Sequence, residues 1–259
     1  MLDERRLRTE LPVDGLGEPL HVYDALDSTN DLCRELAEAG QPGGTLVLAD
    51  EQRHGRGRGA RIWYTPAQSA VAMSMLLRPD QIGEGDHAAV NMLGAVAVVK
   101  ALDTLGLESL IKWPNDVLVQ GRKVASVLTE AAWQGQTLEY VVLGIGVNVR
   151  PNSLPPEEEP DFPASYLDLN VDEPIDREAL IVEIVRGLRC GLELLAAHQL
   201  LPWVEKRLAY MNQEVRIDLE KGSVTGRIVG LDPNGMLHVQ HKDGEVTLVG
   251  SKAHLRSVD

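Results

Sequence analysis

The sequence has few cysteines, no long apolar run and no surplus of positive charge. Its two cysteines, Cys33 and Cys190, are far apart, which fits a reduced cytosolic protein better than a disulfide framework. No apolar run approaches the length of about 18 residues that a membrane span needs, and the first residues lack the core of a signal peptide. The net charge of -14 argues against general nucleic-acid binding, which normally uses a basic stripe. These absences predict an acidic cytoplasmic protein without a membrane or DNA partner.

Several common catalytic signatures are missing too. The chain has no Walker A sequence, no His-Glu-x-x-His, no Cys-x-x-Cys and no Gly-x-Ser-x-Gly. The run from Gly55 to Ala60 formally fits a dinucleotide-binding pattern, but Trp63 and Pro66 follow where a helix would have to begin, so we reject it. The seven histidines are scattered without convincing partners, and we expect them to be solvated or structural.

The most unusual stretch runs from Gln52 to Trp63, where four arginines alternate with three glycines; we call it the arginine loop. Arginine stays charged and presents a planar fork that suits carboxylate and phosphate groups. Glycine lets the backbone approach a ligand closely, and a solvated turn rarely needs it at every second position. A nucleic-acid patch would extend further and lie in a basic field. Because the closing tryptophan can stack a flat heterocycle, the loop favours a small anionic ligand, a nucleotide in particular.

The periodicity of the chain predicts an α+β fold. We expect strands at 45–49, 70–77, 110–113 and 138–149, and a hairpin over 117–128. Helices are expected over 28–40, 86–105, 176–197 and 202–211. From Gln213, short strands separated by close turns indicate a small β-barrel. The sequence therefore predicts two domains, a mixed sheet with helices on one face in residues 1–212 and a barrel in residues 213–259.

Four segments, taken in order, resemble the signature of the biotin–protein ligases. The arginine loop contains Gly55-Arg56-Gly57-Arg58-Gly59-Ala60-Arg61-Ile62-Trp63, similar to Gly-Arg-Gly-Arg-x-Gly-Arg-x-Trp of that family. The others are Asp27-Ser28-Thr29-Asn30, Lys112-Trp113-Pro114-Asn115-Asp116 with Lys123 further on, and Gly144-Ile145-Gly146-Val147-Asn148. The resemblance extends from about Tyr23 to the C-terminus. It implies a biotin/lipoate-ligase-type catalytic domain followed by an SH3-like barrel.

The resemblance implies a two-step reaction. Biotin and ATP, with Mg²⁺, give biotinyl-5′-AMP, and a lysine of a biotin carboxyl carrier domain then takes the biotinyl group. The residues that match catalytic positions of the family are Lys123, Arg56, Arg58 and Lys112. Those that match biotin-binding positions are Ser28, Thr29, Asn30, Gln52, Arg56, Gly57, Arg58, Lys123, Ser126 and Gly144. Those that match ATP-binding positions are Arg56, Arg58, Arg61, Trp63, Asn115, Lys123 and Asn148, and Asp116 is a candidate helper for Mg²⁺.

Two residues depart from the family pattern, since Ala60 and Ser126 stand where it has glycine. We expect both to be tolerated, through a shifted backbone or an extra hydroxyl contact. Only 26 residues precede Asp27, so we also expect a monofunctional ligase without a DNA-binding domain. Two alternatives stay open. One is a lipoate or octanoyl transferase on a similar scaffold, a group that lacks the arginine–glycine signature. The other is a non-catalytic biotin or adenylate sensor, against which the intact Lys123 argues.

Overall fold

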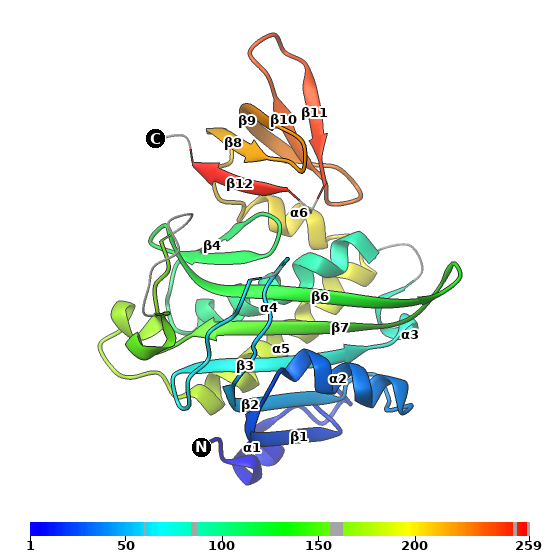
Figure 1. Ribbon diagram of the computed structural model, residues 1–259, viewed down its shortest axis with the longest axis vertical. Helices are drawn as coiled ribbons and strands as arrows, with labels where there is room; N and C mark the ends of the chain where they lie inside the picture. The colour runs from blue at the N-terminus through cyan, green and yellow to red at the C-terminus, as the bar shows by residue number, and fades with distance from the viewer. Residues whose placement is uncertain (60, 84–86, 156–162, 251–252, 258–259) are drawn as a thin grey trace.

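Two β-sheets organise the chain. The computed structural model describes residues 1–59, 61–83, 87–155, 163–250 and 253–257, so Ala60 lies outside the described residues. The larger sheet has seven strands in the order β1-β2-β3-β7-β6-β5-β4, and the smaller has five in the order β11-β10-β9-β8-β12. Figure 1 shows the smaller sheet standing at one end of the larger one, next to helix α6.

The large sheet is mixed, as the sequence predicts. Its strands are β1 Leu20–Leu26, β2 Leu46–Gln52, β3 Ala70–Leu77, β4 Ser109–Lys112, β5 Asp116–Val119, β6 Arg122–Gln134 and β7 Thr137–Asn148. Strands β1 and β2 run parallel, whereas every other neighbouring pair is antiparallel. The predicted β5–β6 hairpin turns at Gln120 and Gly121, which both have the positive φ that a two-residue hairpin turn favours.

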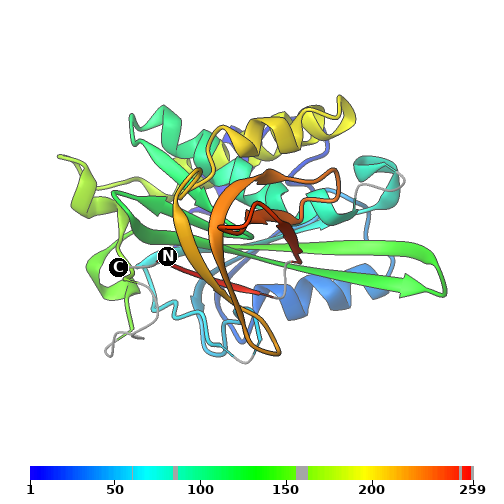
Figure 2. The ribbon, with the colours of Figure 1, turned by 90° about the horizontal axis from the view of Figure 1, so that it is seen from above.

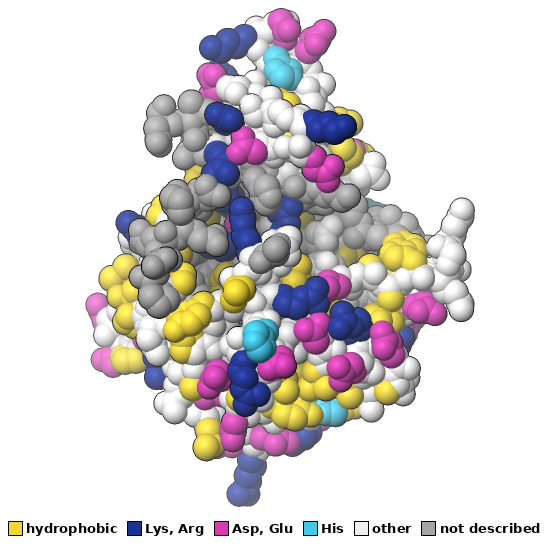
Figure 3. Space-filling view, viewed as in Figure 1, with side chains coloured by type: hydrophobic (Ala, Val, Ile, Leu, Met, Phe, Trp, Pro, Cys, Tyr) yellow, Lys and Arg dark blue, Asp and Glu magenta, His cyan; other side chains and the backbone are white. Residues whose placement is uncertain are grey.

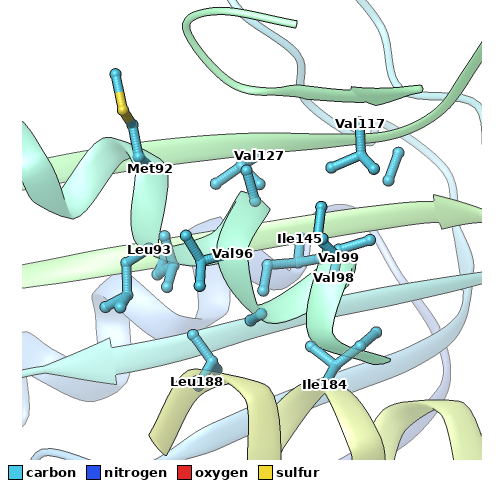
Figure 4. Close-up of a cluster of buried hydrophobic side chains, with 14 of the residues drawn as sticks. Met92, Leu93, Val96, Val98, Val99, Val117, Val127, Ile145, Ile184 and Leu188 are labelled. Atoms are coloured by element: carbon cyan, nitrogen blue, oxygen red, sulfur yellow. The ribbon is translucent and has the colours of Figure 1, made fainter. Parts of the chain in front are cut away.

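Helices cover both faces of this sheet rather than one. The long helices α4 His87–Thr104 and α5 Arg177–Ala196 pack on each other and on one face. There, Leu93 and Val96 of α4 meet Leu188 of α5 and Val127 of β6 (Figure 4). Helix α2 Thr29–Glu38 lies on the opposite face, as Figure 2 shows, and forms a separate apolar cluster with β2, β3 and β7. For this reason β3 is buried along both faces.

The remaining helices are short. They are α1 Glu4–Glu10, α3 Pro79–Ile82 and α6 Leu200–Glu205, with 3-10 turns at Pro151–Ser153 and Leu167–Asn170. The prediction of a helix over 202–211 was wrong at both ends, because α6 begins at Leu200 and ends at Glu205. After it, Leu208 forms a β-bridge with Ile111, and Met211 forms one with Ile228. Among the described residues, no helix is long and apolar enough to cross a membrane.

The small sheet consists of β8 Glu214–Asp218, β9 Ser223–Leu231, β10 Leu237–Gln240, β11 Val246–Val249 and β12 His254–Ser257. All of its pairings are antiparallel. The short strands and close turns that the sequence predicts from Gln213 are present in this sheet. Hydrogen bonds tie this sheet to the rest of the chain; for example, Trp113 Nε1 donates to Gly235 O at 3.0 Å, and the Leu231 amide donates to Glu205 Oε1 at 2.8 Å.

Candidate active site

A pocket opens on the face of the large sheet that carries α2. Eight residues predicted to bind biotin line it, namely Ser28, Thr29, Asn30, Gln52, Arg56, Gly57, Ser126 and Gly144. Trp63, which is predicted to bind ATP, lines it too. The other lining residues, to which no binding role was predicted, are Met73, Val127, Leu128, Ile145 and Gly146. Figure 3 shows basic side chains gathered on this face below the smaller sheet. Arg58 and Lys123 are not among the lining residues.

The N-terminus of α2 forms one wall of the pocket. Ser28 occupies the N-cap position of α2, but its side chain makes no capping hydrogen bond. Gln52 Oε1 accepts from the Thr29 amide at 2.9 Å instead, and Gln52 Nε2 donates to Thr65 Oγ1 at 3.3 Å. The Asp31 carboxylate, one turn further along α2, pairs with Arg34 and Arg56. Ser28 is thus left buried beside the pocket, with its hydroxyl free of a capping role.

A buried polar pair forms the floor of the pocket. Ser74 Oγ donates to Asn30 Oδ1 at 2.6 Å and also lies 2.8 Å from Thr29 Oγ1. Asn30 Nδ2 donates to Glu130 Oε2 at 2.8 Å. A Cβ added at Gly144 would lie 2.1 Å from Asn30 Oδ1, so only glycine leaves room for this amide. Sequence reasoning missed Ser74 and Glu130; a serine inside an otherwise apolar strand was the available signal.

Trp63 lies directly against β7. A Cβ added at Gly146 would be 2.3 Å from Trp63 Nε1, so the second glycine of the Gly-Ile-Gly run makes space for the indole. Trp63 Nε1 is buried and, within the described part of the chain, has no hydrogen-bond partner. Buried donors are normally satisfied, so this one suits an acceptor on a ligand. Lys123 Nζ lies 5.6 Å from the centre of the indole ring.

A cluster of charged side chains adjoins the pocket at Asp116. The Asp116 carboxylate lies 3.1 Å from Lys123 Nζ and 3.6 Å from Lys112 Nζ, and accepts from Ser126 Oγ at 2.7 Å. Burial alone would raise the pKa of Asp116, but the two lysines and Ser126 together lower it. Burial lowers the pKa of Lys112, although Asp116 opposes this. Ser126 thus makes a hydroxyl contact within the protein, while its tolerance in place of glycine and its effect on ligand affinity stay predictions.

Arginine and asparagine side chains extend this cluster. Arg58 Nη1 donates to Asn115 Oδ1 at 3.2 Å, and Arg58 Nη2 donates to Ala253 O, just before β12 of the smaller sheet, at 3.4 Å. Burial lowers the pKa of Arg58, and the positive charge of Arg61 nearby acts in the same direction. Asn148 ends β7 and donates through Nδ2 to Ser165 O at 3.1 Å.

Arg56 lies elsewhere. Its guanidinium pairs with Asp31 and Glu130 on the α2 side of the pocket rather than with the lysine cluster.

The surroundings of Asp116 do not suit a protein-held Mg²⁺. No group of three or more His, Cys, Asp and Glu side chains among the described residues is arranged to hold a metal ion. Asp116 already faces two ammonium groups, which a divalent cation would have to displace. Mg²⁺ bound chiefly through nucleotide phosphates would not need such a site.

Comparisons with known proteins agree in family and fold. The Biotin/lipoate A/B protein ligase family matches residues 22–148, and the Biotin protein ligase C terminal domain matches residues 210–253. The chain is 34% identical over 250 residues to the bifunctional ligase/repressor BirA of Bacillus subtilis, covering 94% of this chain and 76% of that protein. It is 32% identical over 265 residues to the biotin–[acetyl-CoA-carboxylase] ligase of Mycobacterium tuberculosis, covering 98% and 96%. The biotin protein ligase of Aquifex aeolicus, solved in complex with biotin and ATP, is 25% identical with a TM-score of 0.77, covering 92% of this chain and 100% of that one.

Proposed function

The chain belongs to the biotin–protein ligase family, and from this premise we propose how its residues perform the reaction. It is an enzyme that activates biotin with ATP and transfers the biotinyl group to a carrier protein. The observation that carries the residue assignment is the adjacency of two features: a pocket with a polar floor and the lysine cluster at Asp116.

We assign the pocket to biotin. The ureido group of biotin needs both donors and acceptors, and its ring system needs an apolar wall. The polar side chains of Thr29, Asn30 and Gln52 lie on one side of the pocket, whereas Leu128 and the Trp63 ring supply apolar surface. Such a pairing of few placed polar groups with apolar lining is typical of small-molecule sites. Gly144 and Gly146 keep the β7 side of the pocket open to Asn30 and Trp63.

The first step collects negative charge next to this pocket. A biotin carboxylate oxygen bonds to the α-phosphorus of ATP, the bond to the β-phosphate oxygen breaks, and pyrophosphate leaves with that electron pair. Fixed positive charges stabilise such a transition state without reorganisation. We assign Lys123 to bind both the biotin carboxylate and the phosphate of ATP, because its Nζ lies beside the pocket and over the Trp63 ring. Arg58 and Lys112 add charge, Mg²⁺ arrives as MgATP, and the Trp63 ring offers a stacking surface for adenine.

In the second step the ε-amine of the acceptor lysine attacks the acyl carbon, and AMP leaves with the electrons of the mixed-anhydride bond. The amine must be neutral to attack and must shed a proton afterwards. The lowered pKa of Asp116 makes it a weak base, so we assign it as the counter-ion that positions Lys112 and Lys123. Lys112 is the second candidate for assisting the amine, since burial disfavours its charged form.

Transfer to a carrier tests the whole proposal. The enzyme is mixed with MgATP, an apo biotin carboxyl carrier domain and either biotin or lipoate, and mass spectrometry follows the carrier. We expect a biotinyl adduct that disappears when the acceptor lysine is changed to arginine. Labelling by lipoate alone would move the protein to the lipoate or octanoyl transferases. Tight biotin binding without an adduct would identify a sensor.

DNA binding needs a separate test, because a bifunctional ligase/repressor is among the relatives. We propose a cytoplasmic enzyme without a DNA partner, supported by the net charge of -14 and the two free cysteines. A gel shift with a biotin-gene operator fragment, biotin and ATP should show no retarded band. A biotin-dependent band would contradict this part.

A further inference from the structure

Arg56 is held between two carboxylates in the ligand-free chain. Its Nη1 lies 2.7 Å from Asp31 Oδ1 on α2, and its Nη2 lies 2.7 Å from Glu130 Oε1 on β6. The side chains of Arg56, Asp31 and Glu130 are 39%, 35% and 31% exposed. Exposed ion pairs of this kind are individually weak, so an anionic ligand can compete for the guanidinium.

Glu130 has a second, different partner. Its other oxygen, Oε2, accepts from Asn30 Nδ2, whose amide is buried in the floor of the pocket. Asn30 Oδ1 in turn accepts from Ser74 and fills the space that Gly144 leaves open. One carboxylate thus contacts both the arginine loop and the pocket floor. Asp31 pairs with Arg56 of the loop and with Arg34 of its own helix.

We propose that Glu130 is a positioning residue that couples the arginine loop to the biotin pocket. One of its oxygens fixes the orientation of the Asn30 amide. The other, together with Asp31, holds Arg56 until the carboxylate or phosphate of a substrate takes the guanidinium. This inference rests on the proposed function, because it takes biotin and ATP to be the substrates.

Two substitutions at Glu130 separate these roles. In E130Q the new amide oxygen can still accept from Asn30, but the negative charge that holds Arg56 is gone. In E130A both contacts are lost. The matched control is E183Q, which removes the same charge from an exposed pair with Arg186 on α5, across the sheet from the pocket. D31N adds a variant that affects the loop and leaves Asn30 alone.

Trypsin cleavage of the ligand-free proteins reports on the loop, since arginines lie along it. Losing one exposed pair should speed cleavage between Gly55 and Trp63 by about two- to fivefold in E130Q, E130A and D31N. Calorimetry with biotin reports on the floor. Affinity should stay within about threefold of wild type in E130Q and D31N, and fall about tenfold or more in E130A, where a buried amide loses a charged acceptor. E183Q should match wild type in both assays.

Wild-type biotin affinity in E130A, or a wild-type cleavage rate in E130Q, would overturn the coupling. An equal loss of affinity in D31N and E130A would also overturn it, because Glu130 accepts from the Asn30 side chain and Asp31 does not. A thermal melt of each variant checks that it is folded. If the wild-type protein itself fails to bind biotin, the proposed function fails, whereas the cleavage rates still test what holds the loop.

Discussion

The charge of Asp116 is expected to contribute measurably to stability, because it faces two lysines in a largely buried cluster. The substitution Asp116→Asn keeps the shape and an oxygen that can accept from Ser126. It removes a negative charge whose oxygens lie 3.1 Å from Lys123 Nζ and 3.6 Å from Lys112 Nζ. Removing one partner of a buried ion pair typically costs about 3–5 kcal/mol. The lysine side chains are 24% and 11% exposed, and water offsets part of that cost, so we expect about 2–3 kcal/mol.

Differential scanning calorimetry measures this loss. For a chain of this size each kcal/mol corresponds to about 2–4 °C, so Tm should fall by about 4–12 °C at neutral pH. The matched control is Asp103→Asn, which removes an exposed pair with Arg207 and should cost no more than about 1 kcal/mol. Saturating ATP should recover more stability in Asp116→Asn than in wild type, because its phosphates return negative charge to the lysines.

The pH dependence gives a second, independent check. Asp116 has a lowered pKa in the folded protein, because the lysines outweigh the opposing effect of burial. Its stabilising contribution is therefore complete above the unfolded pKa of about 3.9, and is lost as the pH falls through the folded value. The Tm difference between wild type and Asp116→Asn should be full near neutral pH and shrink below about pH 4. Equal Tm values at neutral pH would refute the counter-ion role. If Asp116→Asn keeps the wild-type Tm and also needs a higher Mg²⁺ concentration for activity, Asp116 is a metal ligand instead.

Three further results are expected. Lys123→Ala should slow biotin-dependent pyrophosphate release by about 10²–10³-fold, as the loss of a fixed charge at a developing anion does, and full activity in this variant would contradict its assignment. Ser126→Gly removes one hydrogen bond to Asp116, so calorimetry should give a biotin affinity within about threefold of wild type; a large gain would show that the serine obstructs the pocket. Iodoacetamide should label Cys190 and spare Cys33 in the native protein, because Cys33 is fully buried and burial raises its pKa to about 12. Modification of native Cys33, detected by peptide mass spectrometry, would contradict this.

Local patterns predicted much of the fold, and tertiary contacts account for what they missed. Alternating and continuous apolar runs located the strands, and the helix predicted over 176–197 is present, with the Asp176 side chain accepting from the Ala179 amide as its N-cap. No local pattern could place α2 on the face opposite α4 and α5, because that depends on how the chain crosses the sheet.

The same limit applies to the site. Ser28, Thr29 and Gly144 line one pocket, as their motifs suggested, but the roles of Ser74 and Glu130 come from strand register. Ser74 stands opposite Gly144 in the β3–β7 pairing, and Glu130 lies one strand further along the sheet, on β6. Arg56 lies between two carboxylates because α2, which carries Asp31, packs on β2, β3 and β7, next to β6, which carries Glu130. The sequence of the arginine loop alone does not predict this arrangement.

The central claim is that this chain joins biotin to AMP before any carrier is present. Exchange of labelled pyrophosphate into ATP tests that step alone, with the enzyme, MgATP and either biotin or lipoate. We predict exchange that requires biotin, is absent with lipoate and is slowed by about 10²–10³-fold in Lys123→Ala. Exchange supported by lipoate alone, or none at all while biotin binds, would contradict the account.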